Sequence, residues 1–201
     1  MNWKSYLERH VVMLIDLLQK QVDRTLSFLD TSGQEENISD IANIEEIIDE
    51  ELLYIYKHTV SFLSEESDEN AVLAILVLLE LAIKLEESSD MMLSTIRMLG
   101  EIQAIPQNIV FLMRQMLDIL KEAYGDLHPL SAPFKLRPEQ RDMVIDIQYR
   151  QITEVIKDAN IPRTSMIMLG RISRHIELLG DTAKDAIKLK QTYLSTIEKL
   201  T

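Results

Sequence analysis

Apolar residues recur at intervals of three or four over long stretches of this chain. One such run extends from Ile41 to Phe62 and a second from Leu169 to Leu200. This spacing places the apolar side chains on one face of a helix, and that face has to be buried against another element. Signals for strands and tight turns are few, because only 5% of the residues are aromatic and Gly and Pro number 5 each. We therefore predict an all-α fold in which helices pack on helices.

Helix breakers divide the chain into about six predicted helices. The first helix is expected to begin near Trp3. Proline is tolerated in the first turn of a helix and Ser is a common N-cap, so both residue types mark helix starts. The predicted breaks are 30–34, 64–68 with Ser67 as the cap of the third helix, a fourth start at Pro106, an irregular stretch over 125–138, and a last start at Asn160 and Pro162.

The second half of the sequence resembles the first. Three pairs of segments align, namely 10–16 with 108–114, 45–49 with 142–146, and 85–90 with 176–181. The offset holds within each helix and changes between helices, as loops of different length would cause. We predict two tandem three-helix repeats, over residues 1–103 and 104–201. Chance similarity between amphipathic helices is the alternative.

Acidic residues outnumber basic ones, with 33 Asp and Glu against 21 Lys and Arg and a formal net charge of -12. A field of this sign repels the phosphate backbone, so we expect no nucleic-acid partner. It favours metal ions, other cations or basic protein surfaces, although ordinary solubility also explains it.

The chain has no cysteine, which excludes disulfide bonds and thiolate metal sites. Its longest charge-free apolar run, 71–79, is far shorter than the roughly 18–20 residues of a membrane-spanning helix. Charged residues occupy the place of a signal peptide's apolar stretch. We expect a soluble, cytoplasmic protein without a transmembrane segment. The helix around 71–79 is apolar almost all round, so we expect it to be buried on more than one side, by packing between the two repeats or, as the alternative, in a dimer interface.

Pairs of acidic residues four apart recur at matching places in the two predicted repeats. Side chains at i and i+4 lie on one helix face, so two carboxylates can reach one cation. Since 33 acids among 201 residues produce about five such pairs by chance, only their recurrence is informative. Oxygen ligands suit Mg²⁺, Mn²⁺ and Fe²⁺. The candidate metal ligands are Glu45, Asp49, Glu86 and Asp90 in a first acidic set, and Asp142, Asp146, Glu177, Asp181 and Asp185 in a second.

The acids of the last helix lie nearly opposite its apolar stripe, at about 100° per residue. They are therefore not buried core ligands. Two interpretations stay open, namely a metal site on the protein surface and an ordinary solvated helix face. Arg174 precedes Glu177 by three residues and is expected to form a salt bridge with it. His175 and Glu177 are two residues apart and do not face each other, so we expect an ordinary surface histidine.

At these residues the chain resembles the PhoU family. That family repeats a three-helix unit twice, and each third helix carries Glu or Asp, three residues, then Asp. Its fuller pattern, Leu-Glu-Arg-Ile-Gly-Asp-His-Ala, is matched at Glu177, Gly180, Asp181 and Ala183 in the second half, and at Leu85, Glu86 and Asp90 in the first. Glu87 and Leu178 stand where the family has Arg, so the resemblance is to a divergent member.

The resemblance implies a regulator of phosphate uptake and phosphate signalling that contacts a phosphate transporter and/or a sensor histidine kinase. It also implies a divalent metal ion (Fe, Zn, Mn or Mg), a homodimer, and peripheral association with the membrane through the transporter. We expect the second set to bind metal better, because it keeps Gly180 and can recruit Asp185. Few basic residues lie near the acids, so we do not expect phosphate to bind there.

Two other functions are compatible with the sequence. A carboxylate-bridged di-metal enzyme needs Glu-x-x-His on inward helix faces. The residues three before the four histidines are Leu7, Ile55, Gly125 and Ile172, none of them acidic. Phosphate-binding glycine loops and nucleophile elbows are missing too, so we expect no enzymatic activity. A structural helical adaptor whose acids bind nothing is the other alternative.

Overall fold

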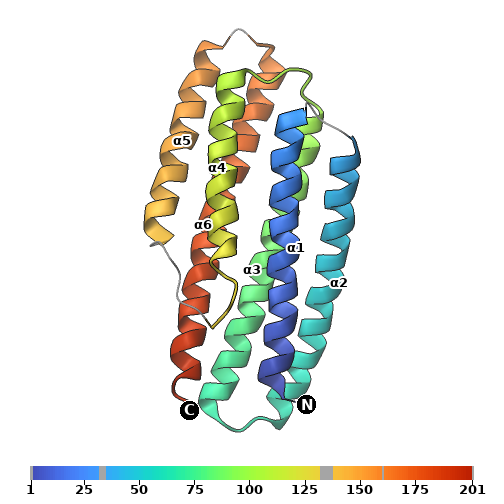
Figure 1. Cartoon of the computed structure of the whole chain (residues 1–201), viewed down its shortest axis with the longest axis vertical. Helices are drawn as coiled ribbons and strands as arrows, with labels where there is room; N and C mark the ends of the chain where they lie inside the picture. The colour runs from blue at the N-terminus through green and yellow to red at the C-terminus, as the bar shows by residue number, and fades with distance from the viewer. Residues whose placement is uncertain (1, 32–34, 132–137, 160, 201) are drawn as a thin grey trace.

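The computed structural model describes residues 2–31, 35–131, 138–159 and 161–200. These residues form six helices and no strand, which confirms the predicted all-α fold (Figure 1). The helices are α1 (Trp3–Thr31), α2 (Glu35–Glu65), α3 (Glu69–Gly100), α4 (Gln107–Gly125), α5 (Pro138–Asp158) and α6 (Arg163–Ile197).

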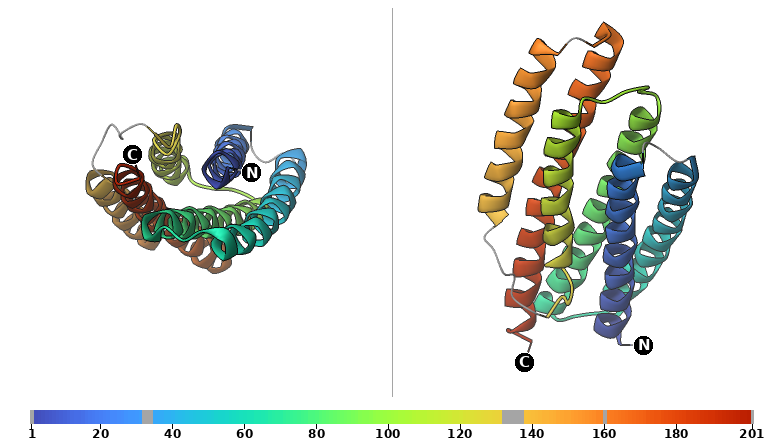
Figure 2. Two further views of the ribbon diagram at one scale, coloured as in Figure 1. Left: turned by 90° about the horizontal axis from the view of Figure 1, so that it is seen from below. Right: turned by 45° about the horizontal axis from the view of Figure 1, so that its top comes forward.

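Four of the helices form a curved layer in the order α2, α3, α6, α5 (Figure 2). α1 and α4 pack against each other on the concave side of this layer. α3 and α6 run side by side in its middle and join the two halves of the chain. The face of the layer turned away from α1 and α4 is called the outer face below.

The linker between α3 and α4, residues 101–106, contains the boundary predicted between residues 103 and 104. Three helices therefore lie on either side of that boundary. The duplication itself stays a prediction.

The observed helix starts differ from the predicted ones by about a residue, which is the ordinary uncertainty of helix ends. α3 is capped by Asp68 and not by Ser67. The Asp68 carboxylate accepts hydrogen bonds from the backbone N–H groups of Asn70 and Ala71, at 2.8 and 3.1 Å. An ionised Asp suits this position because it also complements the positive end of the helix dipole.

Proline marks two other helix starts as predicted. Pro106 and Pro162 each directly precede a helix, α4 and α6 respectively. Asn160, which was expected to open α6 together with Pro162, lies outside the described residues.

The apolar run 71–79 lies in the first third of α3, which contacts α1, α2 and α6. Its burial on more than one side is confirmed by the buried residues Ala71, Ala74, Ile75, Val77 and Leu78. Its place between the two halves stays a prediction. Two of its leucines nevertheless stay partly in solvent, because Leu73 and Leu76 are 44% and 43% exposed. Both leucines therefore lie on a side of α3 that no described helix covers fully.

Buried polar contacts fix the turn that follows α4. The Arg141 guanidinium pairs with the Asp126 carboxylate at 2.7 Å, and both side chains are buried. The Lys190 ammonium of α6 donates to the backbone carbonyls of Asp126 and Pro129, at 2.6 and 2.8 Å. Burial lowers the pKa of Lys190, and the nearby Asp126 charge opposes this shift. These bonds hold the end of α4 against α5 and α6.

No helix in the described part of the chain is both long and apolar enough to span a membrane.

Candidate metal centre

The first acidic set comes together where α2 and α3 run side by side. Glu45 and Asp49 project from α2 towards Asp90 of α3, and one carboxylate oxygen of each lies within 4.8 Å of the other two. Within the described ranges, this is the only group of three or more acidic or histidine side chains with that spacing. The i and i+4 spacing predicted Glu45 and Asp49 as a pair, and helix packing supplies the third carboxylate from α3.

Glu86, the fourth member of the first set, lies close enough to affect the same charges. Burial raises its pKa first, and the charges of Asp90 and Asp49 raise it further. It therefore adjoins the cluster, although it is not one of the three closest carboxylates.

Mutual repulsion is visible throughout the first set. Burial raises the pKa of Glu45, followed by the Asp49 charge and a hydrogen bond with Asp90, and the Arg97 charge lowers it in part. Burial and then the Asp90 charge raise the pKa of Asp49. None of the four acids forms an ion pair with a described Lys, Arg or His. Carboxylates held together without a counter-charge favour a bound cation.

The second acidic set already contains side-chain cations. The Lys184 ammonium donates to Asp142 of α5 at 2.7 Å and to Asp181 of α6 at 2.9 Å. Burial lowers the pKa of Lys184, but the hydrogen bonds to Asp142 and Asp181 outweigh it, so the net pKa lies well above its ordinary range. Lys184 therefore stays charged and occupies the position between two predicted ligands.

Two further acids of the second set, Glu177 and Asp185, also form ion pairs with basic side chains. Arg174 forms the predicted salt bridge with Glu177, and Lys188 pairs with Asp185 at 3.4 Å. Asp146 is close enough to Glu177 to raise its pKa, although burial of Glu177 is the larger cause. Asp185 is thus paired with Lys188. These ion pairs argue against the expectation that the second set binds metal better than the first.

Sequence reasoning missed the role of Lys184. Its position three residues after Asp181 is an ordinary ion-pair spacing on a helix and could have indicated the local pair. Its bond to Asp142 depends on how α5 packs against α6, which the sequence pattern does not reveal. Metal binding stays a prediction for both sets.

His175 differs from the surface histidine that we expected. The residue is half-buried, and its Nδ1 atom is buried without a hydrogen-bond partner among the described residues. Burial lowers its pKa, and the positive charge of Arg171 lowers it further. His175 belongs to a surface separate from the first acidic set.

No protein-family model matches the sequence, and no curated protein matches it either. Among solved structures, PhoU from Pseudomonas aeruginosa superposes with a TM-score of 0.75. The match covers 96% of this chain and 97% of that chain, at 17% sequence identity. A likeness at this identity shows the fold alone, and the chain accordingly has a PhoU-like fold of six helices.

Proposed function

We propose that this protein is a PhoU-like regulator of phosphate uptake and signalling that binds one divalent cation between α2 and α3. The observation that supports it is the unneutralised carboxylate cluster of Glu45, Asp49 and Asp90 in this fold. Glu86 supplies additional negative charge beside it. The protein acts by contact with a phosphate transporter and/or a sensor histidine kinase, and we assign no catalytic step to it.

The chemistry of the cluster favours a hard or borderline ion. All its ligands are carboxylate oxygens, which suit Mg²⁺, Mn²⁺ and Fe²⁺ better than Zn²⁺, whose sites are usually rich in nitrogen and sulfur. Two oxygens that bind one ion at about 2.1 Å lie at most about 4.2 Å apart. Small side-chain rotations therefore bring carboxylate atoms now within 4.8 Å of one another into one coordination sphere.

The wider assignment follows the fold. We propose that residues 1–103 and 104–201 are two copies of one three-helix unit. Among the described residues, the first acidic set has no ion pair with a side-chain cation, unlike the second. We propose a homodimer in the cytoplasm that reaches the membrane only through its transporter partner.

A structural adaptor without metal is the second candidate function. The ion pairs of Lys184, Arg174 and Lys188 favour it for the second set, since acids neutralised by side chains do not require a metal. For the first set, we accept this alternative only if the following experiment shows no metal binding.

Thermal unfolding with added Mn²⁺ tests the proposal. The chelator-treated wild-type protein should melt at a higher temperature as Mn²⁺ is added, because binding to the folded state contributes about 2.7 kcal/mol at 100 times Kd. The double variant Glu45→Gln with Asp90→Asn should lose most of this rise. Its matched control, Glu177→Gln with Asp181→Asn, removes two acids from the second set and should retain it.

Two results would contradict the proposal. One is a wild-type melting temperature that Mn²⁺, Fe²⁺ and Mg²⁺ all leave unchanged. The other is an equal loss of the metal response in the two double variants, since this would locate the effect in overall charge and not in the first set.

A further inference from the structure

A groove lies on the outer face where α3 and α5 adjoin α6. Its volume is about 650 Å³, and it is a hollow that is widely open to solvent. The polar side chains that line it are Ser94 of α3, Tyr149 of α5, and Arg171, Arg174 and His175 of α6. No member of the first acidic set lines the groove.

The groove is locally basic in a chain whose formal net charge is -12. Arg171 is exposed and forms no ion pair with any residue that the structure describes. Arg174 contacts Glu177 through one of its nitrogens, Nη1, which leaves other guanidinium N–H groups available. Glu177 offsets the charge of Arg174 in part, so Arg171, unpaired among the described residues, carries most of the positive charge of the groove.

His175 brings a half-buried imidazole to the groove, which is a first indication of a ligand site. Its Nδ1 atom is buried and lacks a hydrogen-bond partner in the described part of the chain. Because Nδ1 is closed to solvent, a ligand in the groove would contact the other ring nitrogen, Nε2.

Gly170 gives a second indication. It lies inside α6, where Gly destabilises a helix by about 1 kcal/mol relative to Ala. A Cβ atom placed on Gly170 would have no neighbour within 4 Å, so helix packing does not require a glycine there. The residue lines the groove, and a methyl group at this position would protrude into it. Gly170 thus keeps this part of the groove open, as a ligand site would require.

We propose that this groove binds a doubly charged tetrahedral oxyanion of the phosphate class through Arg171, Arg174 and His175. A guanidinium group can donate two parallel N–H bonds to two oxygens of such an anion. The imidazole N–H and the Ser94 hydroxyl can donate to the remaining oxygens. This inference goes beyond the proposed function and does not depend on it, because the groove and the first acidic set share no residue.

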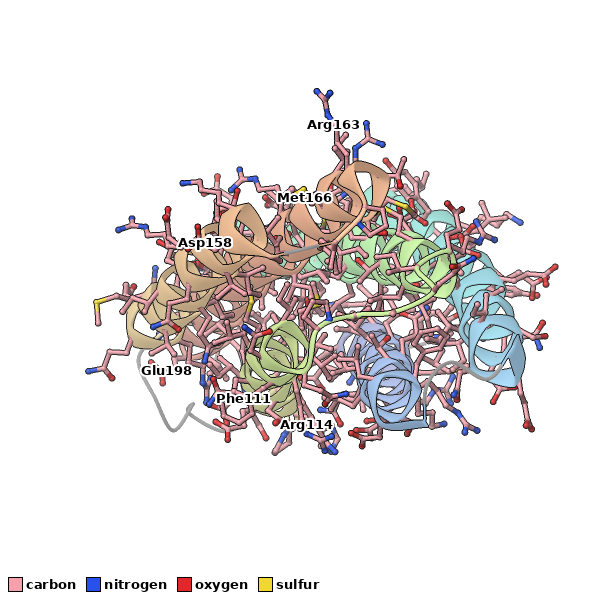
Figure 3. All side chains as sticks on the ribbon, turned by 90° about the horizontal axis from the view of Figure 1, so that it is seen from above. Phe111, Arg114, Asp158, Arg163, Met166 and Glu198 are labelled. Carbon is pink, nitrogen blue, oxygen red and sulfur yellow. The ribbon has the colours of Figure 1, made fainter. Side chains whose placement is uncertain are left out.

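Isothermal titration with inorganic phosphate, in chelator and at constant ionic strength, tests the inference. Wild-type protein should bind phosphate, and Arg171→Gln should weaken binding at least about tenfold. The matched control is Arg163→Gln, which changes an exposed arginine of the same helix outside the groove (Figure 3). It should leave the affinity unchanged.

Gly170→Ala separates a binding effect from a folding effect. This variant should melt no lower than wild type and still bind phosphate more weakly, because the added methyl group occupies the groove. A phosphoserine peptide that displaces phosphate would identify the physiological source as a phosphorylated partner, and failure to displace it would identify the free anion.

Three results would overturn the inference. These are no heat of binding for wild type, equal weakening by Arg171→Gln and Arg163→Gln, or a response that chloride at the same ionic strength reproduces. The chelator keeps this experiment separate from the metal titration, so either proposal can fail while the other stands.

Discussion

Lys184 shows how one side chain changes what a cluster of acids can bind. Its ammonium group hydrogen-bonds Asp142 and Asp181 from the position between them. In the first set, no described lysine or arginine takes that position among Glu45, Asp49 and Asp90. A divalent ion can outcompete solvent for such carboxylates, but it would have to displace the tethered ammonium in the second set. The two sets therefore differ through one residue more than through their acids.

Replacement of Lys184 should convert the second set into a metal site. In chelator, Lys184→Met should destabilise the protein by about 1 kcal/mol, because two partly buried carboxylates lose their counter-charge. In the background Glu45→Gln with Asp90→Asn, adding Lys184→Met should restore a rise in melting temperature with Mn²⁺. Lys188→Met, which removes an exposed partner of Asp185, is the control and should restore none. The absence of any gain with Lys184→Met would show that Asp142 and Asp181 cannot hold a metal even when free.

Helix α6 contains two glycines in opposite surroundings. Gly170 faces open space, whereas a Cβ atom at Gly180 would lie 2.9 Å from Cδ1 and 3.3 Å from Cγ2 of the buried Ile145. The absence of a side chain at Gly180 thus lets α5 approach α6 closely. This packing explains the glycine that matches the family pattern at this position.

The same substitution should therefore have opposite effects at the two glycines. Gly170→Ala should stabilise the protein by up to about 1 kcal/mol, because it improves helix propensity without a clash. Gly180→Ala gains the same propensity, but overpacking against Ile145 costs about 1–3 kcal/mol, so the net effect should be destabilising. Urea unfolding at neutral pH measures both. Equal effects at the two positions would show that the α5–α6 contact adjusts without strain.

Most of the helices could be predicted from the sequence, because the signals that define them are local. The apolar period, the prolines at 106 and 162 and the polar breaks are all readable within a few residues. The cap of α3 was assigned one residue early, because Ser67 and Asp68 are both good N-caps and only the backbone geometry selects between them.

The candidate site could be predicted only in part, for a physical reason. Glu45 and Asp49 are neighbours on one helix, so the i and i+4 rule predicts them as a pair. Their approach to Asp90, the insertion of Lys184 beside Asp142, and the groove along α6 all depend on packing between helices. Periodicity indicates which face of a helix is buried, but not which helix covers it.

At the scale of the whole molecule, the first acidic set and the basic groove use different sets of neighbouring helices and share no residue. The first acidic set lies between α2 and α3, and the basic groove lies along α6, beyond the α3–α6 contact. α3 is common to both, since it carries Asp90 and, one turn further on, Ser94. A shift of α3 relative to α6 is the simplest way in which an occupied groove could influence metal binding.

A side-chain hydrogen bond connects the first and last helices. The buried Tyr193 hydroxyl of α6 donates to the Glu8 carboxylate of α1 at 2.7 Å. Burial raises the pKa of Tyr193, and its hydrogen bond with Glu8 raises it further, so the phenol stays protonated in the folded protein well above pH 10. Because the folded state then keeps a proton that the unfolded state has lost, this contribution to stability falls as the pH rises above about 10.

Tyr193→Phe should therefore weaken the fold in a pH-dependent way. Below pH 10 the variant should lose about 0.5–1.5 kcal/mol, the usual net value of one hydrogen bond. Above pH 10 the difference in free energy of unfolding between the variant and wild type should become smaller. The reason is that only wild type has to keep this phenol protonated in order to fold. Urea unfolding at about pH 8 and pH 10.5 compares the two, with Tyr54→Phe at an exposed position as the control. If the gap is the same at both pH values, the bond to Glu8 does not couple proton binding to folding. If instead the gap narrows, the folded protein keeps the Tyr193 proton at a pH where the unfolded chain has lost it, as burial and the bond to Glu8 predict.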